Sequence, residues 1–269
     1  MKKFFKAIGK AILYLLFYFG IQTVVSFVFA IVATVLMMLS GDTELATLES
    51  DLLNYTTVIL LISNVLSLVL VWLFFVIRKK RFTSEIQLHK CKAKQLLPVA
   101  VLGLGFAFGL NWMVEIIPFP ESMMESFMTS HDTLSVGNPI INFISVAILT
   151  PIVEEVFFRG LIYTRLKSGM PTVIAAILSA ALFGLMHGEI VWMIFAFGVG
   201  LVLVWVFERT QSLWGCIVVH AVNNGLSQLA ESEINLPIGV EWILGVISVV
   251  LFVASAVYVI KSRGGEVTE

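Results

Sequence analysis

Long apolar runs, broken by short polar segments, extend along most of this chain. The run from Ala11 to Leu39 contains no charged residue, and similar runs recur as far as Ile260. Backbone polar groups inside a bilayer must be satisfied by the protein itself, so runs of this kind fold as helices. Hydrophobic residues make up 59% of the chain and charged residues 13%, against roughly 25% charged residues in soluble domains. We therefore expect an all-α, polytopic membrane helix bundle rather than a soluble α/β enzyme.

Eight of these runs fit helices that cross a bilayer, at about 20 residues per crossing. The first run is longer than the ~7–15-residue apolar region of a signal peptide, so we expect it to be retained as a span. The fifth, sixth and seventh runs are short and closely spaced. The expected limits of the eight helices are 11–39, 56–77, 95–117, 139–164, 171–188, 190–207, 213–229 and 241–260.

The basic residues are confined to alternate loops. If the N-terminus is cytoplasmic, 16 of the 17 basic residues lie on the cytoplasmic side, whereas the outer loops carry acidic residues and no basic one. This segregation follows the positive-inside rule and places both termini in the cytoplasm. The seventeenth basic residue is Arg159, inside the fourth run. The other sixteen are Lys2, Lys3, Lys6, Lys10, Arg78, Lys79, Lys80, Arg81, Lys90, Lys92, Lys94, Arg165, Lys167, Arg209, Lys261 and Arg263.

Several patterns outside the fourth run are interpreted as structural. The basic loop 78–94 is interpreted as a topology anchor, not as an anionic-lipid or nucleic-acid site, and no nucleic-acid partner is expected. Cys91 and Cys216 lie in very different surroundings and no Cys-x-x-Cys occurs, so neither a disulfide nor a zinc knuckle is indicated.

The amphiphilic segment 118–138 is expected at the outer interface, with no assigned role. Lone amides are expected to link helices by hydrogen bonds; they are Asn64, Asn111 and Asn142.

Three charged residues interrupt the fourth run, whose flanks carry no charge. An ionised group in the bilayer costs at least ~2.5–3.5 kcal/mol on insertion scales, so the group needs a partner or a purpose. Glu155 and Arg159 are four residues apart and share a helical face, which predicts an ion pair. Glu154 points about 100° away and can face the interior of the bundle. Pro151, one turn earlier, can loosen the helix. A purely structural charge network is the alternative.

Polar residues in two later runs can converge on Glu154. His187 lies late in the fifth run, and His220 and Asn224 are four residues apart in the seventh. Two of the chain's four histidines therefore lie in apolar runs, which packing alone does not readily explain. At 1.5 Å per residue, Glu154 and His220 lie ~16 and ~14 Å from the cytoplasmic ends of their helices. His187 lies deeper, at ~25 Å, unless its helix is tilted or begins later.

These residue types can hydrolyse a peptide bond. A carboxyl group away from water can act as general base and then as general acid, and a neutral histidine can share the activation of the water. Another histidine and an amide can donate hydrogen bonds to the oxyanion, an effect of roughly 3–4 kcal/mol per donor. Alternatively, His187, His220 and one glutamate would form an open three-ligand site suited to zinc, although the chain lacks HExxH. Spacing alone leaves both versions open.

Three motifs in order resemble the CPBP intramembrane proteases, which include type II CAAX prenyl endopeptidases and bacterial bacteriocin-processing or immunity (Abi) proteins. They are Glu-Glu-x-x-x-Arg at 154–159, Phe-x-x-x-His at 183–187 and His-x-x-x-Asn at 220–224, within a resemblance that covers about 140–230. The resemblance implies about eight spans and endopeptidase activity near the C-terminus of a peptide or protein. The family is often called metalloprotease, though a metal-free glutamate mechanism is also argued for it. The implied roles are water activation by Glu154 and His187, an oxyanion site of His220 and Asn224, and support by Glu155 and Arg159.

The resemblance divides the chain into an N-terminal three-span region (1–135), a catalytic core (136–230), and a last span with a cytoplasmic tail (231–269). The expected function is hydrolysis of a membrane-associated peptide or protein in a bacterial cell membrane. Two other functions stay open. One is a non-enzymatic immunity or scaffold protein that binds a peptide or a sensor. The other is a proton-coupled transporter, which the lack of an inverted repeat or of paired broken helices disfavours.

Overall fold

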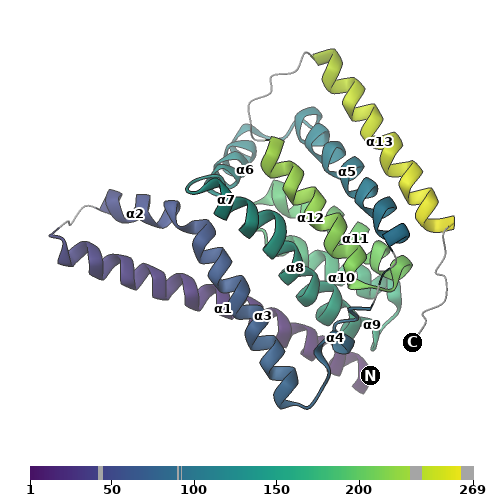
Figure 1. Cartoon of the computed structure of the whole chain (residues 1–269), viewed down its shortest axis with the longest axis horizontal. Helices are drawn as coiled ribbons and strands as arrows, with labels where there is room; N and C mark the ends of the chain where they lie inside the picture. The colour runs from purple at the N-terminus through teal and green to yellow at the C-terminus, as the bar shows by residue number, and fades with distance from the viewer. Residues whose placement is uncertain (42–44, 90, 92, 231–237, 262–269) are drawn as a thin grey trace.

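A computed structural model describes the chain except for residues 42–44, 90, 92, 231–237 and 262–269. Every regular element in the described residues is a helix, so the predicted all-α bundle is confirmed (Figure 1). In chain order the elements are α1 (Lys2–Leu39), α2 (Leu45–Asn54), α3 (Thr56–Ile77), α4 (Phe82–Glu85), α5 (Ala93–Ile116), α6 (Glu121–Thr133), α7 (Pro139–Asn142), η1 (Phe143–Leu149), α8 (Thr150–Glu155), η2 (Val156–Tyr163), α9 (Thr164–Lys167), α10 (Thr172–Leu185), α11 (Ile190–Thr210), α12 (Leu213–Ala230) and α13 (Ile238–Lys261).

All eight predicted spans coincide with helices, and the protein is a multi-pass membrane protein. Among the described residues, six helices are long and apolar enough to cross a membrane: α1, α3, α5, the continuous helix Pro139–Lys167, α11 and α13. The helix Pro139–Lys167 joins α7, η1, α8, η2 and α9, and we call it the central helix. Because α10 and α12 are not among the six, the count of eight crossings stays a prediction.

The predicted limits 171–188 of the fifth span are too long. α10 has 14 residues, or about 21 Å of helix, which is less than the ~30 Å of a hydrocarbon core. It ends at Leu185, and Gly188 adopts φ +78°, a left-handed conformation that suits glycine and lets the chain turn directly into α11. His187 therefore lies in a turn at the end of a short helix.

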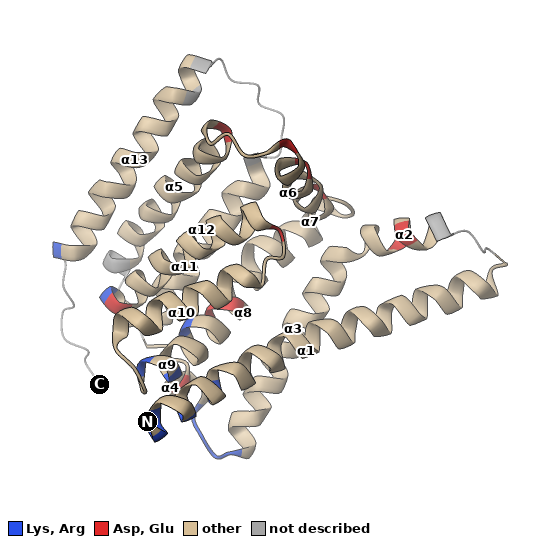
Figure 2. Cartoon of the chain, turned by 180° about the vertical axis from the view of Figure 1, so that it is seen from behind, with Lys and Arg blue, Asp and Glu red and all other residues tan. Residues whose placement is uncertain are grey.

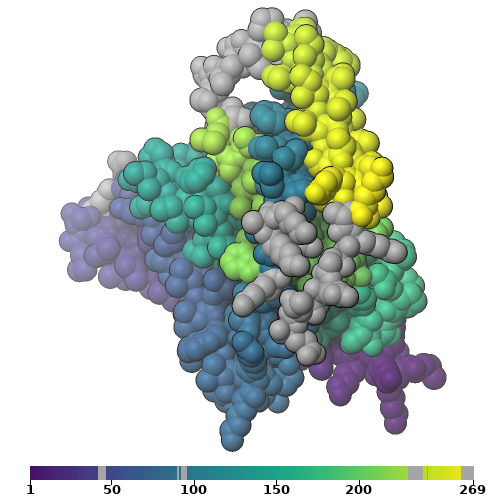
Figure 3. Space-filling model, turned by 45° about the vertical axis from the view of Figure 1, so that its right-hand side comes forward, coloured from purple at the N-terminus to yellow at the C-terminus, as the bar shows by residue number. Residues whose placement is uncertain are grey.

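The central helix lies at the middle of the bundle, in contact with α1, α3 and α12. All eight residues of η2 are buried, and Tyr18 of α1 stacks on Phe157 of η2 with ring centroids 4.8 Å apart. On one side α5 packs between α12 and α13, so α13 forms an outer face of the molecule (Figure 3). The site residues expected at 154–159 therefore lie on the most enclosed helix.

Charge is distributed along the axis of the bundle. Lysine and arginine gather at the end that carries α4, α9 and the first turn of α1, whereas the acidic residues of α6 lie at the opposite end (Figure 2). Lys261, in the last turn of α13, belongs to the residues predicted to be cytoplasmic. This distribution agrees with the orientation that the positive-inside rule predicts.

Two of the three lone amides link helices, as predicted. Asn64 of α3 donates to Thr150 Oγ1 at 2.9 Å and accepts a hydrogen bond from Tyr18 at 3.4 Å, so it joins α3 to α8 and α1. Asn142 accepts a hydrogen bond from Thr57 Oγ1 at 2.6 Å, which joins α7 to α3. Asn111 instead lies on an internal cavity described below. Polar links of this kind stabilise helix association where the hydrophobic effect between helices is absent.

Gly105 permits the close approach of α5 and α13. A Cβ atom at this position would lie 2.7 Å from both Phe252 N and Ser248 O, which are backbone atoms that cannot move aside. We expect Gly105→Ala to destabilise the protein by about 1–3 kcal/mol through overpacking. Gly20→Ala is the matched control, because no atom lies within 4 Å of its added Cβ. Thermal unfolding in detergent should show a lower midpoint for Gly105→Ala only; equal midpoints would contradict the tight contact.

Candidate active site

Two π-helical segments, η1 and η2, flank the acidic pair on the central helix. Such segments are often found at functional sites. Pro151 helps to explain the first one, because proline has no N–H to donate to the preceding turn. In a π-helical turn, residue 151 would donate to Val146 O. That carbonyl instead accepts a hydrogen bond from Asn224 Nδ2 of α12 at 3.1 Å. The loosening expected at Pro151 thus creates an attachment point for the third motif.

Glu155 and Arg159 form the predicted ion pair. Arg159 Nη1 donates to Glu155 Oε1 at 2.7 Å, and both side chains are fully buried. Arg159 also donates through Nη2 to Gly200 O of α11 at 3.2 Å and lies over the Phe183 ring at 4.4 Å. The i, i+4 spacing keeps the two side chains on one face even though η2 is π-helical. The pair therefore joins the central helix to α10 and α11.

His220 of α12 connects the two glutamates. Its Nδ1 lies 2.8 Å from Glu155 Oε1, and its Nε2 lies 3.6 Å from Glu154 Oε2. A carboxylate paired with arginine can only accept hydrogen bonds, so His220 Nδ1 carries the proton in this contact. In the neutral ring, Nε2 then presents its lone pair towards Glu154. The role of Glu155 in orienting a histidine cannot be deduced from local spacing, because 65 residues separate the two.

His187 is oriented by its own helix end. Its Nδ1 lies 2.8 Å from Phe183 O, and because a carbonyl only accepts, Nδ1 carries the proton here too. Nε2 of the neutral ring is left as the acceptor. The Phe183 ring contacts both histidines, with centroid distances of 4.9 Å to His187 and 5.7 Å to His220. The phenylalanine of the second motif therefore positions both histidines and the Arg159 guanidinium around one aromatic ring.

An internal cavity of about 320 Å³ joins these groups. Its lining includes Glu154, His187, His220 and Asn224, and the ion pair of Glu155 and Arg159 lies behind it. Asn223 also lines the cavity, and its buried Oδ1 has no hydrogen-bond partner among the described residues. Asn223 was not predicted as a site residue, because Asn224 and not Asn223 lies four residues after His220. The structure thus brings the four cavity residues and the two supporting residues together.

α6 covers the outer side of this cavity. Phe127 and His131 of α6 line it, and both rings contact Trp192 of α11, at 6.0 and 6.4 Å between centroids. Ser126 Oγ donates to Glu189 Oε2 at 2.5 Å and fixes α6 to the turn that carries His187. Segment 118–138, expected only at the outer interface, therefore contains a helix that forms part of the cavity wall. Phe127 and His131 are four residues apart and therefore share the face of α6 that lines the cavity.

The donor groups do not fit the zinc site that the sequence leaves open. Within the described residues, no three His, Cys, Asp or Glu side chains are grouped so as to hold one metal ion. Both histidines present Nε2 with Nδ1 engaged, as metal-binding histidines also do. However, Glu155 is committed to Arg159 and His220. The chemistry proposed below therefore uses the side chains alone.

A carboxylate and two histidines on a cavity inside a membrane bundle form a candidate site for acid–base chemistry. Comparison with known proteins defines the class further. Residues 136–226 match the Rce1-like family, described as type II CAAX prenyl endopeptidase Rce1-like. The "Putative membrane peptidase YdiL" of Bacillus subtilis (strain 168) is 25% identical over 87 residues, which are 32% of this chain and 36% of that relative. None of the solved structures matches.

These findings confirm the family that the three motifs predict. Residues 136–226, about a third of the chain, are similar to the type II CAAX endopeptidases of the CPBP family. The matched region contains all three motifs and the central helix. The 87 residues aligned with the relative from Bacillus subtilis cover only 36% of its length, so the activity of the whole protein is a matter for proposal.

Proposed function

We propose that the protein is an intramembrane endopeptidase that hydrolyses a peptide bond of a membrane-associated peptide or protein. The observation that carries the proposal is the meeting of Glu154, His187 and His220 on one cavity, with Nδ1 of each histidine fixed by an acceptor. Fixed tautomers leave both Nε2 atoms available for proton transfer. The family of residues 136–226 supports the same reaction class.

In the proposed reaction, a water molecule lies between the Glu154 carboxylate and His187 Nε2. Glu154 takes a proton from the water as the oxygen attacks the substrate carbonyl carbon, and a tetrahedral oxyanion forms. Glu154 then gives this proton to the departing amine as the C–N bond breaks, which leaves a carboxylic acid and an amine.

His220 and Asn224 are proposed to stabilise the oxyanion. The Asn224 amide has two N–H groups, and only one is used by Val146 O. His220 can donate through Nε2 only when its ring carries a second proton, and we propose that form for this step. Glu155 and Arg159 act as positioning residues. We propose this metal-free version over the metalloprotease version because the described donor groups do not form a three-ligand site.

We further propose that the protein acts in a bacterial cell membrane, on a peptide such as a bacteriocin precursor or an immunity-related target. The relative from Bacillus subtilis, named a putative membrane peptidase, supports the bacterial setting, whereas the substrate class follows only from the resemblance of the motifs to Abi proteins. The position of α6 supports entry of substrate from the outer side, because the cavity is covered there by a helix and not by the bundle itself.

His187→Ala is expected to lower peptide cleavage by about 10²–10⁴-fold, because it removes the acceptor that shares activation of the water. The control is His89→Ala, since His89 lies on the basic side, where its Nε2 contacts Gln87, and does not line the cavity. Cleavage should be followed in membranes that contain equal amounts of each variant. If His187→Ala retains the turnover of His89→Ala, the proposed water activation is wrong.

A further inference from the structure

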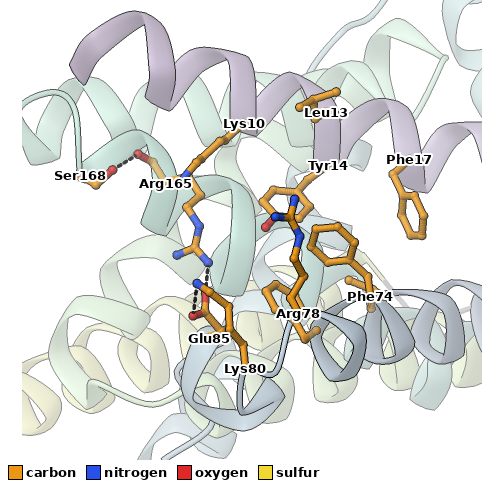
Figure 4. Close-up of a pocket in the computed structure, with 12 residues that line it drawn as sticks. Lys10, Leu13, Tyr14, Phe17, Phe74, Arg78, Lys80, Glu85, Arg165 and Ser168 are labelled. Atoms are coloured by element: carbon orange, nitrogen blue, oxygen red, sulfur yellow. Dashed lines mark hydrogen bonds and ion pairs between the residues drawn. The ribbon is translucent and has the colours of Figure 1, made fainter. Parts of the chain in front are cut away.

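A second, larger cavity of about 770 Å³ lies at the basic end of the bundle, between α1, α3, α4 and α9 (Figure 4). It is separate from the proposed active site, and the two share no lining residue. Its polar lining consists of four basic residues, one acidic residue, one tyrosine and one serine. They are Lys10, Arg78, Lys80, Arg165, Glu85, Tyr14 and Ser168.

Two helix stripes with the same spacing form its apolar wall. On α1, Leu13, Tyr14 and Phe17 follow Lys10 at i+3, i+4 and i+7, and on α3 an apolar stripe with the same spacing ends at Arg78. Residues at this spacing share one helical face. In each stripe the basic residue stands at the basic end of the bundle. The wall is open to the side, because the Leu13 side chain is 67% exposed.

The acidic residue neutralises only part of the charge. Glu85 accepts hydrogen bonds from Lys80 at 2.8 Å and from Arg165. Burial alone would raise the pKa of Glu85, but these two cations outweigh it and hold the pKa below its ordinary value, so the carboxylate stays ionised. Lys10 and Arg78 form no ion pair or hydrogen bond in the part of the chain that the structure describes, and Arg78 lies over the Phe74 ring at 5.2 Å.

We propose that this cavity binds an anionic phospholipid, with the phosphate of the head group between Lys10 and Arg78 and an acyl chain along the apolar wall. A site for free phosphate would need the cations but not the five apolar side chains that continue from them. The sequence predicts that the basic loop 78–94 acts as a topology anchor. That role requires positive charge on this side of the membrane but no cavity. The joint presence of unpaired cations and a lateral apolar wall matches the two ends of one lipid molecule.

Native mass spectrometry of the full chain in detergent tests this proposal, with equimolar dioleoylphosphatidylglycerol and dioleoylphosphatidylcholine as probes. The wild type should retain phosphatidylglycerol preferentially. Lys10→Gln/Arg78→Gln should lower its occupancy by about 10- to 30-fold, because each basic residue near an anionic head group contributes roughly a factor of five. Arg209→Gln/Lys261→Gln removes the same charge from residues on the same side that do not line the cavity, and should leave occupancy within about twofold.

Equal losses in the two double variants would overturn the proposal, because the effect would then be general surface charge. A lack of preference for phosphatidylglycerol in the wild type would also overturn it. Displacement of the lipid by millimolar inorganic phosphate would assign the cations to a free-phosphate site instead. Unfolding midpoints measured for both double variants would separate a loss of binding from a loss of fold. Leu13→Ser, at an exposed position of the apolar wall, should weaken lipid retention without altering the charge.

Discussion

Glu154→Gln is expected to lower peptide cleavage by about 10²–10⁴-fold or more while the protein stays folded in the membrane. Glutamine keeps the size of the side chain and its position 3.6 Å from His220 Nε2, but it cannot take a proton from water. Glu154 is proposed to act as both base and acid, so its loss removes two steps of the reaction. The assay is turnover of a fluorogenic peptide, or of a co-expressed substrate, in membranes.

Glu208→Gln is the matched control, because Glu208 lies at the end of α11 and pairs with Lys167 and Tyr163 on the basic side. It should cleave substrate at the rate of the wild type. Cleavage by Glu154→Gln at that same rate would remove Glu154 from the chemistry. Full biological complementation by Glu154→Gln would favour the non-enzymatic alternative, an immunity or scaffold protein.

Arg159→Met is expected to destabilise the protein by about 3–5 kcal/mol, because it leaves the Glu155 charge buried without its cation. Glu155 and Arg159 are fully buried, and Arg159 also contacts Gly200 and the Phe183 ring. Lys80→Met is the control: it breaks an exposed pair with Glu85 and should cost only about 0.2–1 kcal/mol. Thermal unfolding of the purified variants compares the two.

The double variant Glu155→Leu/Arg159→Met separates stability from function. Replacement of a whole buried ion pair by apolar side chains is often close to neutral, so much of the lost stability should return. Cleavage should not return, because His220 Nδ1 would lack the carboxylate at 2.8 Å that fixes its tautomer. Recovery of both stability and cleavage would show that Glu155 does not position His220.

Local features of the site could be predicted from the sequence. The i, i+4 spacing predicted the pair of Glu155 and Arg159, and the charge census predicted the basic end of the bundle. These predictions succeed because helical geometry and bilayer insertion act on neighbouring residues and on loops as wholes. Pro151 similarly indicated a break in regular helix, although the π-helical form of η1 and η2 was not predicted.

Long-range features could not be predicted. The contact of His220 with Glu155 joins residues 65 positions apart. A single sequence does not indicate how two distant helices align along each other. The turn that carries His187 was not predicted, because the apolar run 171–188 has the composition of a full span, whereas α10 ends at Leu185 and the chain turns at Gly188. The cover formed by α6 depends on the contacts of Ser126 and Trp192, which no periodicity in segment 118–138 specifies.

The most direct test of the proposed endopeptidase is mass spectrometry of peptides from cells that carry the wild type, Glu154→Gln or His187→Ala at equal protein levels. Growth in ¹⁸O-labelled water marks the new C-terminus formed by hydrolysis. The proposed mechanism predicts one set of labelled peptides that is present with the wild type and absent from both variants, with the uncleaved precursors accumulating. Identical peptide sets in all three strains would contradict it.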